Sequence, residues 1–283
     1  MTTAQTRATT HSREVPDTAR QGLELTQFRD LWQGGYYEGD PLDPMAPSGY
    51  GPFGYMNSLH VTYIRCIRPY VTSNTRVLEI GPGRGAWTRC FVERNAREIW
   101  ALDALSAEHN GFWKYVGKHP AIQYFQVQDN LCAMIPDGSI DYFFSFGTFC
   151  HLSPQVTKEY LQSLSRVLRP GARGFLMIAD YDKFNAMLAA EDRFSITRSF
   201  SGKRQLPLRW AWKIWSLFFK PHHFVPQSAR EDDTPRPGRW YHLGIDRATQ
   251  MLNDAGFVVI DRDVGVNLRD PVIEFEKPAP AER

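Results

Sequence analysis

Apolar residues recur with two alternating kinds of spacing through the middle of the chain. Short apolar runs predict buried strands, and segments with an apolar residue at every third or fourth position predict amphipathic helices. Strands are expected at 76–80, 97–102, 121–127, 140–146 and 174–179. Helices are expected between them, at 86–94, 106–117 and from Ser153-Pro154 to Arg169-Pro170-Gly171. Alternation of strand and helix at this spacing predicts a parallel, doubly wound sheet.

The pattern changes near the C-terminus. Asp246 is predicted to cap a helix that ends at Gly256, and two strands follow at 257–262 and 271–276. The short connection between these strands cannot hold a helical crossover, so an antiparallel hairpin is expected. The predicted fold class is therefore α/β: a Rossmann-like, mostly parallel seven-stranded sheet with an antiparallel C-terminal hairpin.

Regions outside the alternating pattern define the predicted organisation. The N-terminal region reads as a helical cap, with helices at 23–33 and from 57 or 58 to about 70, and a further segment is inserted after the fifth strand. The predicted parts are a mobile tail at 1–22, the cap at 23–72, a cofactor-binding core at 73–180, the insertion at 181–240, the completion of the core at 241–277 and a tail at 278–283.

Composition narrows the class of protein. The chain has 283 residues, 42% of them hydrophobic, which is enough for one large domain with additions. Its formal net charge of +2 gives no general reason to expect nucleic acid as a partner. Four separated cysteines show no paired spacing, and the chain has neither a signal-peptide pattern nor an apolar run long enough to span a bilayer. A cytoplasmic location is expected.

The most informative motif follows the first predicted strand. Arg76 to Ala86 reads RVLEIGPGRGA, with glycines at 81, 83 and 85. Glycine lets the backbone turn at positive φ and approach a ligand closely, and the helix that Trp87 opens favours an anion at its N-terminus. The motif predicts a nucleoside cofactor, with Gly81, Gly83, Gly85 and Trp87 among its contacts. Taken alone, it also fits a dinucleotide-binding turn.

Glu79, two residues before the first glycine, distinguishes the two alternatives. The run Glu-x-Gly-x-Gly-x-Gly resembles motif I of the class I S-adenosylmethionine-dependent methyltransferases, and the resemblance covers about residues 70–180 and 240–277. It implies S-adenosylmethionine as cofactor, with the acidic residue near its methionine end and the glycines beneath it. An NAD-dependent oxidoreductase using the same turn is the alternative.

Further cofactor contacts are expected after the second and third strands. Asp103 ends the second strand, where a carboxylate can accept hydrogen bonds from ribose hydroxyls. Asp129 and Asn130 follow the third strand, and the resemblance implies that an acidic or amide residue there meets the adenine amino group. A helix cap at Asp103 and an Asx turn at 129–130 are the structural alternatives.

Candidate catalytic residues follow the fourth and fifth strands. The segment 143–152 is expected to line both cofactor and acceptor, with Phe146 on the cofactor side. It resembles the post-strand motif of small-molecule and sugar methyltransferases, often His-His-Leu, although Cys150 replaces the first histidine and only His151 matches. Asp180 ends the fifth strand, so a His151–Asp180 pair could act as a general base on a hydroxyl. Surface capping is the alternative for Asp180.

A divalent metal is another way to acidify a hydroxyl. Asp180, Asp182 and Asn185 offer oxygen ligands, which leaves Mg²⁺ open without favouring it. No metal ligand is therefore assigned.

The insertion has an unusual composition. Between Arg193 and Arg230 there are eight Lys or Arg and no acid, together with several Trp, and residues 206–220 predict a helix with one narrow polar stripe. Three roles are consistent with this: a lid or homodimer interface, a pocket for a carbohydrate or anionic glycoconjugate, or transient membrane contact for a lipid-linked acceptor. We expect an O-methyltransferase acting on a hydroxyl of a sugar, polysaccharide or glycoconjugate, with a lipid-linked or other small molecule as the alternative acceptor.

Overall fold

The computed structural model describes residues 29, 40–44, 58–189, 225–226, 229–230, 232–234 and 238–279. The predicted tail at 1–22, the predicted helix at 206–220 and, apart from residue 29, the predicted helix at 23–33 lie outside the described residues. The strands are β1 (Arg76–Ile80), β2 (Glu98–Asp103), β3 (Ile122–Gln126), β4 (Ile140–Ser145), β5 (Leu168–Met177), β6 (Val258–Asp261) and β7 (Val272–Glu276).

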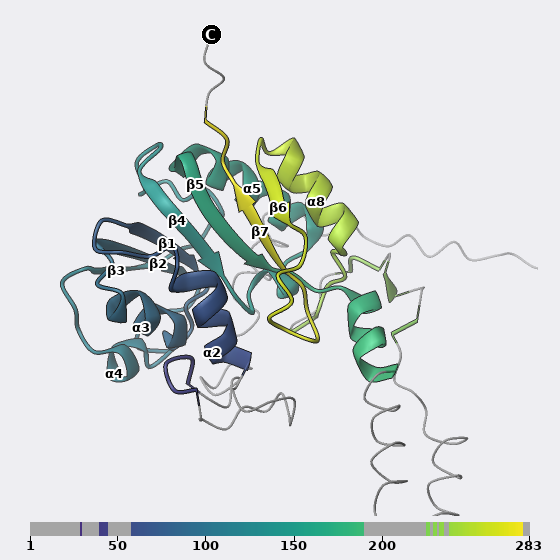
Figure 1. The fold of residues 1–283 in the computed structure, drawn as a ribbon, viewed down its shortest axis with the longest axis horizontal. Helices are drawn as coiled ribbons and strands as arrows, with labels where there is room; N and C mark the ends of the chain where they lie inside the picture. The colour runs from purple at the N-terminus through teal and green to yellow at the C-terminus, as the bar shows by residue number, and fades with distance from the viewer. Residues whose placement is uncertain are drawn as a thin grey trace, which may run out of the picture.

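These strands form one sheet in the order β3-β2-β1-β4-β5-β7-β6 (Figure 1). The strands β1 to β5 pair in parallel, and β7 is antiparallel to both β5 and β6. The central strands are apolar on both sides because helices cover both faces of a parallel sheet. The predicted seven-stranded α/β fold with its C-terminal hairpin is confirmed.

Helices occupy both faces of the sheet (Figure 1). They are α2 (Ser58–Thr62), the π-helix η1 (Tyr63–Ile67), α3 (Ala86–Glu93), α4 (Phe112–Val116), the 3₁₀ turn η2 (Phe149–His151), α5 (Pro154–Val167) and α8 (Ile245–Asp254). One apolar core lies between the sheet and α5 with α8, and a second lies between the sheet and η1, α3 and α4. Residues 181–189 are also helical and follow β5 after a connection of three residues.

The start of α5 agrees with the prediction, because Ser153 caps the helix by accepting a hydrogen bond from the Val156 amide and Pro154 occupies the first turn. The start of α8 does not. Asp246 lies within the first turn, and the amide of Ile245 donates instead to Asp180 Oδ2 at 2.9 Å. The prediction that Asp246 caps this helix was wrong, because a carboxylate from a distant strand end supplies the acceptor.

Two element boundaries also differ from expectation. The helix α4 is shorter than the predicted 106–117 because Gly111 and Gly117, both at positive φ, flank it. The strand β5 starts at Leu168 rather than at 174, pairing with Ile140 before an irregular step in the register. Parallel pairing brings the carboxyl ends of β1 to β5 to one edge of the sheet, and this edge carries the predicted site residues.

Candidate active site

The glycine turn at the end of β1 is closely packed against its own protein. Gly81, Gly83 and Gly85 have φ values of 73°, 54° and 97°, which L side chains rarely adopt. A Cβ at Gly81 would lie 1.9 Å from Thr148 Oγ1, and one at Gly85 would lie 2.2 Å from Val116 Cγ2. The loop after β4 and the helix α4 therefore already exclude side chains at two of the three positions.

Glu79 is a buried carboxyl beside this turn, with only 2% of its surface exposed. Thr88 Oγ1 donates to Glu79 Oε2 at 2.6 Å, while Oε1 has no hydrogen-bond partner among the described residues. Burial raises the pKa of Glu79 to about 8, the nearby Asp103 carboxylate adds to the rise, and the Thr88 hydrogen bond opposes it. A cation placed beside Glu79 would favour its ionised form.

Asp103 connects β2 to the glycine turn. Its Oδ2 accepts from the Gly83 amide at 3.0 Å and its Oδ1 from the Leu105 amide at 2.9 Å. Burial raises the pKa of Asp103, and these amide hydrogen bonds counteract the rise. Each carboxylate oxygen can accept more than one hydrogen bond, so the carboxylate can hold the turn and still accept from a ribose hydroxyl.

Asp129 and Asn130 lie in the loop that follows β3. Asp129 Oδ1 accepts from the Leu131 amide at 2.9 Å, which is the Asx turn that the sequence left open. Asn130 is fully buried, and its Nδ2 donates to Glu159 Oε2 on α5 at 2.9 Å. The third strand end thus places acceptor oxygens at the same edge as Glu79 and Asp103.

Trp87, in the first turn of α3, packs against the rings of Phe144 and Phe146. The ring centroids of Trp87 and Phe146 are 4.9 Å apart, and Phe144 lies 5.3 Å from Trp87. The side chains of Trp87 and Phe146 are buried, with 4% and 5% exposure. Their packing supports the glycine turn from the protein side, and cofactor contact by either residue stays a prediction.

His151 lies in η2, just beyond the carboxyl end of β4. Its Nδ1 is 2.9 Å from the Arg239 carbonyl oxygen, which can only accept. His151 therefore carries its proton on Nδ1 and presents Nε2 as the unprotonated nitrogen. Burial lowers the pKa of His151 to about 4, so the imidazole is neutral across the physiological range.

Asp180 has a different environment from the one expected of a catalytic partner. Its Oδ1 accepts from the amides of Asp182 and Lys183 at 2.8 and 3.0 Å, and its Oδ2 accepts from the amide of Ile245 at 2.9 Å. The carboxylate thus caps both the 181–189 helix and α8. The Arg239 carbonyl, rather than Asp180, orients the imidazole of His151.

Sequence reasoning missed a group of aromatic residues next to His151. This aromatic cluster consists of Tyr181, Phe184, Trp240 and His242. The Tyr181 hydroxyl donates to the Trp240 carbonyl and its amide donates to His242 Nδ1, while Arg269 lies over the Trp240 ring at 5.3 Å. Because Trp240 follows Arg239, the cluster adjoins His151. The sequence signals were the Trp-rich character of the insertion, to which Trp240 belongs, and the position of Tyr181 shortly after β5.

The oxygen atoms considered as metal ligands have protein partners. Asp180 caps two helices, Arg230 donates to Asp182, and Asn185 exchanges two hydrogen bonds with the backbone of Val225. Among the described residues, no group of three or more His, Cys, Asp or Glu is placed to hold a metal ion. The same part of the chain contains no helix long and apolar enough to cross a membrane.

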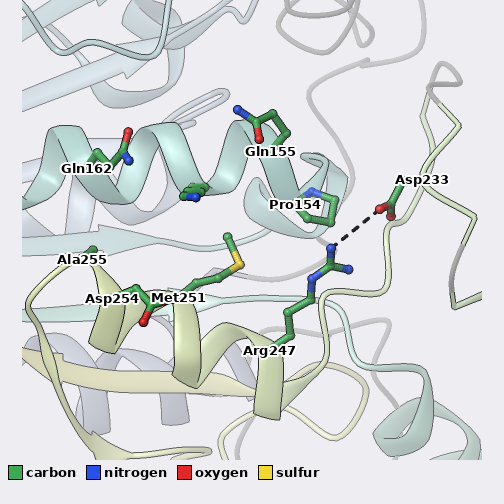
Figure 2. A pocket seen from close by; sticks show the side chains of 9 residues that line it. Pro154, Gln155, Gln162, Asp233, Arg247, Met251, Asp254 and Ala255 are labelled. Atoms are coloured by element: carbon green, nitrogen blue, oxygen red, sulfur yellow. Dashed lines mark ion pairs between the residues drawn. The ribbon is translucent and has the colours of Figure 1, made fainter. Parts of the chain in front are cut away.

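A separate groove of about 450 Å³ runs between α5 and α8. Figure 2 shows Gln155 and Gln162 on α5 and Arg247 and Met251 on α8 among the residues that line it, with Arg247 paired to Asp233 at 3.8 Å. None of the predicted site residues lines it. The groove therefore lies apart from the glycine turn, although Gln155 on its wall contacts Glu159.

Comparison with known proteins identifies the class. Residues 77–171, which include the glycine turn, Asp103, Asp129 and His151, match the family model described as a methyltransferase domain. Over this segment the chain is similar to class I methyltransferases. Solved structures with this fold include S-adenosylmethionine-dependent methyltransferases. No curated protein matches it in sequence.

Solved structures of methyltransferases share the fold of this chain. A putative methyltransferase from Haloferax volcanii, solved in complex with the Trm112 methyltransferase activator, has a TM-score of 0.50 and 12% identity, covering 80% of this chain and 90% of that chain. A putative S-adenosylmethionine-dependent methyltransferase from Listeria monocytogenes has a TM-score of 0.49 and 12% identity, covering 78% and 98%. The 1,6-didemethyltoxoflavin-N1-methyltransferase of Burkholderia thailandensis has a TM-score of 0.44 and 16% identity, covering 72% of each chain.

Proposed function

We propose that this methyltransferase binds S-adenosylmethionine at the carboxyl edge of β1 to β3. Glu79 would face its methionine end, the glycines at 81, 83 and 85 its underside, and Asp103 its ribose. Asp129 and Asn130 would face the adenine, with Trp87 and Phe146 supporting the site. When bound, the cofactor supplies an electrophilic methyl group.

The charge around the turn supports this cofactor over a dinucleotide. The buried Glu79 carboxyl has one oxygen without a partner among the described residues, and Asp103 lies nearby. A cation favours the ionised form of Glu79, whereas a pyrophosphate does not, so this carboxyl suits the sulfonium and ammonium groups of S-adenosylmethionine better than NAD. The oxidoreductase alternative is therefore not proposed.

We propose a hydroxyl oxygen as the methyl acceptor and His151 as the general base. The single observation that carries this proposal is the hydrogen bond between His151 Nδ1 and the Arg239 carbonyl, which fixes the tautomer with an unprotonated Nε2. Such a nitrogen can take the hydroxyl proton as the new bond forms, a role worth roughly 10²- to 10⁴-fold in rate. Asp180 is not retained in this role, because its carboxylate caps two helices.

The aromatic cluster supports a carbohydrate acceptor. Aromatic faces stack against the apolar faces of sugar rings, such as those of a polysaccharide or glycoconjugate. Residues 181–240 would then recognise the acceptor, and a lipid-linked molecule is the second candidate. All four cysteines are free and buried, which supports a reducing, cytoplasmic location.

The test is a methyl-transfer assay against fractionated cell extracts, scored by a gain of one methyl mass. With an acceptor in hand, His151→Ala should lower kcat by roughly 10²-fold or more while leaving the Kd for S-adenosylmethionine nearly unchanged. The exposed His119→Ala is the matched control and should leave both quantities unchanged.

The pH profile adds a second readout. Burial lowers the pKa of His151 to about 4, so its base form persists well below pH 6.5. We expect kcat/KM to show no loss attributable to this histidine between pH 5.5 and 8. Weaker cofactor binding with unchanged kcat in His151→Ala would place His151 in the cofactor site and sink the proposal.

A further inference from the structure

One side chain on α5 determines the orientation of Asn130. Glu159 Oε2 accepts from Asn130 Nδ2 at 2.9 Å, and Glu159 Oε1 accepts from Gln155 Nε2, also at 2.9 Å. The Glu159 carboxylate is thus fixed from both sides. Because Gln155 and Glu159 are four residues apart on α5, helix geometry brings their side chains together.

A second residue of α5 fixes the rest of the loop. Arg166 donates to the carbonyls of Leu131, Cys132 and Ile135 at 3.0, 2.9 and 3.1 Å. It also forms an ion pair with Asp137. The loop after β3 is therefore held along its length by one rigid helix.

The chemistry of Glu159 decides what Asn130 can offer to a ligand. An ionised carboxylate only accepts hydrogen bonds, so the amide must turn its Nδ2 toward Glu159 and its Oδ1 away. That Oδ1 is buried and has no partner in the described part of the chain. Asp129, the preceding residue, also offers carboxylate oxygens. The loop thus presents acceptors and suits a ligand group that donates.

We propose that Glu159 is a positioning residue that makes this loop select a purine with a 6-amino group over its 6-oxo counterpart. The 6-amino group donates two hydrogen bonds, whereas a 6-oxo group accepts and would face the acceptors of Asn130 and Asp129. The inference rests on the proposed cofactor site and deepens it, because it assigns base selectivity to a residue outside that site.

The experiment measures Kd by calorimetry for S-adenosylhomocysteine and for S-inosylhomocysteine, its 6-oxo analogue. The wild-type protein should bind the adenosyl compound at least roughly tenfold more tightly. In the inosyl complex the 6-oxo group would face the buried Asn130 Oδ1, and two acceptors cannot form a hydrogen bond. In Glu159→Lys, an ammonium donor replaces the carboxylate beside Asn130. The Asn130 amide should then turn so that its Oδ1 faces the lysine and its Nδ2 faces the base. The adenosyl preference should then fall by roughly fivefold or more.

Two variants make the result interpretable. Lys158 is the neighbour of Glu159 on α5, and Lys158→Ala should leave the adenosyl preference unchanged. Glu159→Ala keeps the experiment decisive if Glu159→Lys does not fold. An alanine removes the orienting acceptor and should also lower the preference.

The outcomes separate the two proposals. If the Glu159 variants lose affinity for both ligands equally, so that the ratio of the two Kd values is unchanged, Glu159 has a structural role only and the inference is overturned. A wild-type protein that binds both compounds equally would also overturn it while leaving the cofactor site intact. Binding of neither compound would overturn the proposed function, and the inference with it.

Discussion

Replacing Glu79 with glutamine tests the electrostatics of the proposed cofactor site. The Glu79 carboxyl is buried, one of its oxygens lacks a partner among the described residues, and its pKa is raised from an ordinary 4.5 to about 8. That difference corresponds to about 5 kcal/mol against the ionised form. In the free protein at pH 7 roughly nine in ten molecules would therefore carry a protonated Glu79.

Binding of a cation should reverse this preference. If Glu79 is ionised in the complex, S-adenosylmethionine binding releases about 0.9 proton at pH 7, and its affinity rises up to about fiftyfold between pH 6 and 8. Glu79→Gln has nothing to ionise and should lose this part of the dependence. The α-amino group of the ligand titrates in both experiments, so the difference between the proteins isolates Glu79.

Calorimetry in buffers with different ionisation enthalpies measures the released proton directly.

A companion measurement is unfolding by urea without ligand. Because the folded-state pKa lies above 4.5, this carboxyl stabilises the fold below that pH, and the contribution is lost as pH rises through about 8. The wild-type protein should lose about 2 kcal/mol more than Glu79→Gln between pH 6 and 8. Equal proton release and equal pH dependence in the two proteins would refute the reasoning.

Two further predictions concern packing and capping. Gly85→Ala should destabilise the protein by about 2–4 kcal/mol in urea unfolding, because its Cβ would lie 2.2 Å from Val116 Cγ2 at a φ of 97°. Val116→Ala in the same chain should recover part of that loss, and no recovery would argue against the clash. Asp180→Ala should cost about 2–4 kcal/mol because three backbone amides lose their acceptor. Lost turnover with unchanged stability would instead restore its catalytic assignment.

Local sequence was sufficient to place the residues of the proposed cofactor site at one edge of the sheet. The glycines, Glu79 and Asp103 lie at or directly after apolar strands, and strand ends of a parallel sheet must meet at one edge. Their positions follow from the strand pattern alone. The same reasoning located His151 after β4, because the chain leaves the sheet there.

Partners that lie far apart in the sequence could not be predicted in this way. The carbonyl that orients His151 belongs to Arg239, 88 residues later, and backbone carbonyls carry no sequence signal. Asp180 reaches Ile245, 65 residues away, so the cap of α8 was assigned to the nearer Asp246. Glu159 lies 29 residues after Asn130, on a helix for which the sequence pattern predicted only an apolar face.

Three strand-end acids that look equivalent in the sequence differ in how many donors the fold gives them. Asp180 accepts from three backbone amides, Asp103 from two backbone amides and the Asn110 side chain, and Glu79 from a single hydroxyl. A carboxylate has about four acceptor sites, so Glu79 keeps the largest capacity for a ligand. Glu79 is therefore the acid best suited to meet a cation, Asp103 can bind the turn and a hydroxyl together, and Asp180 is committed to the scaffold. Counting internal donors thus singles out Glu79 as the candidate ligand-binding acid where strand position alone cannot.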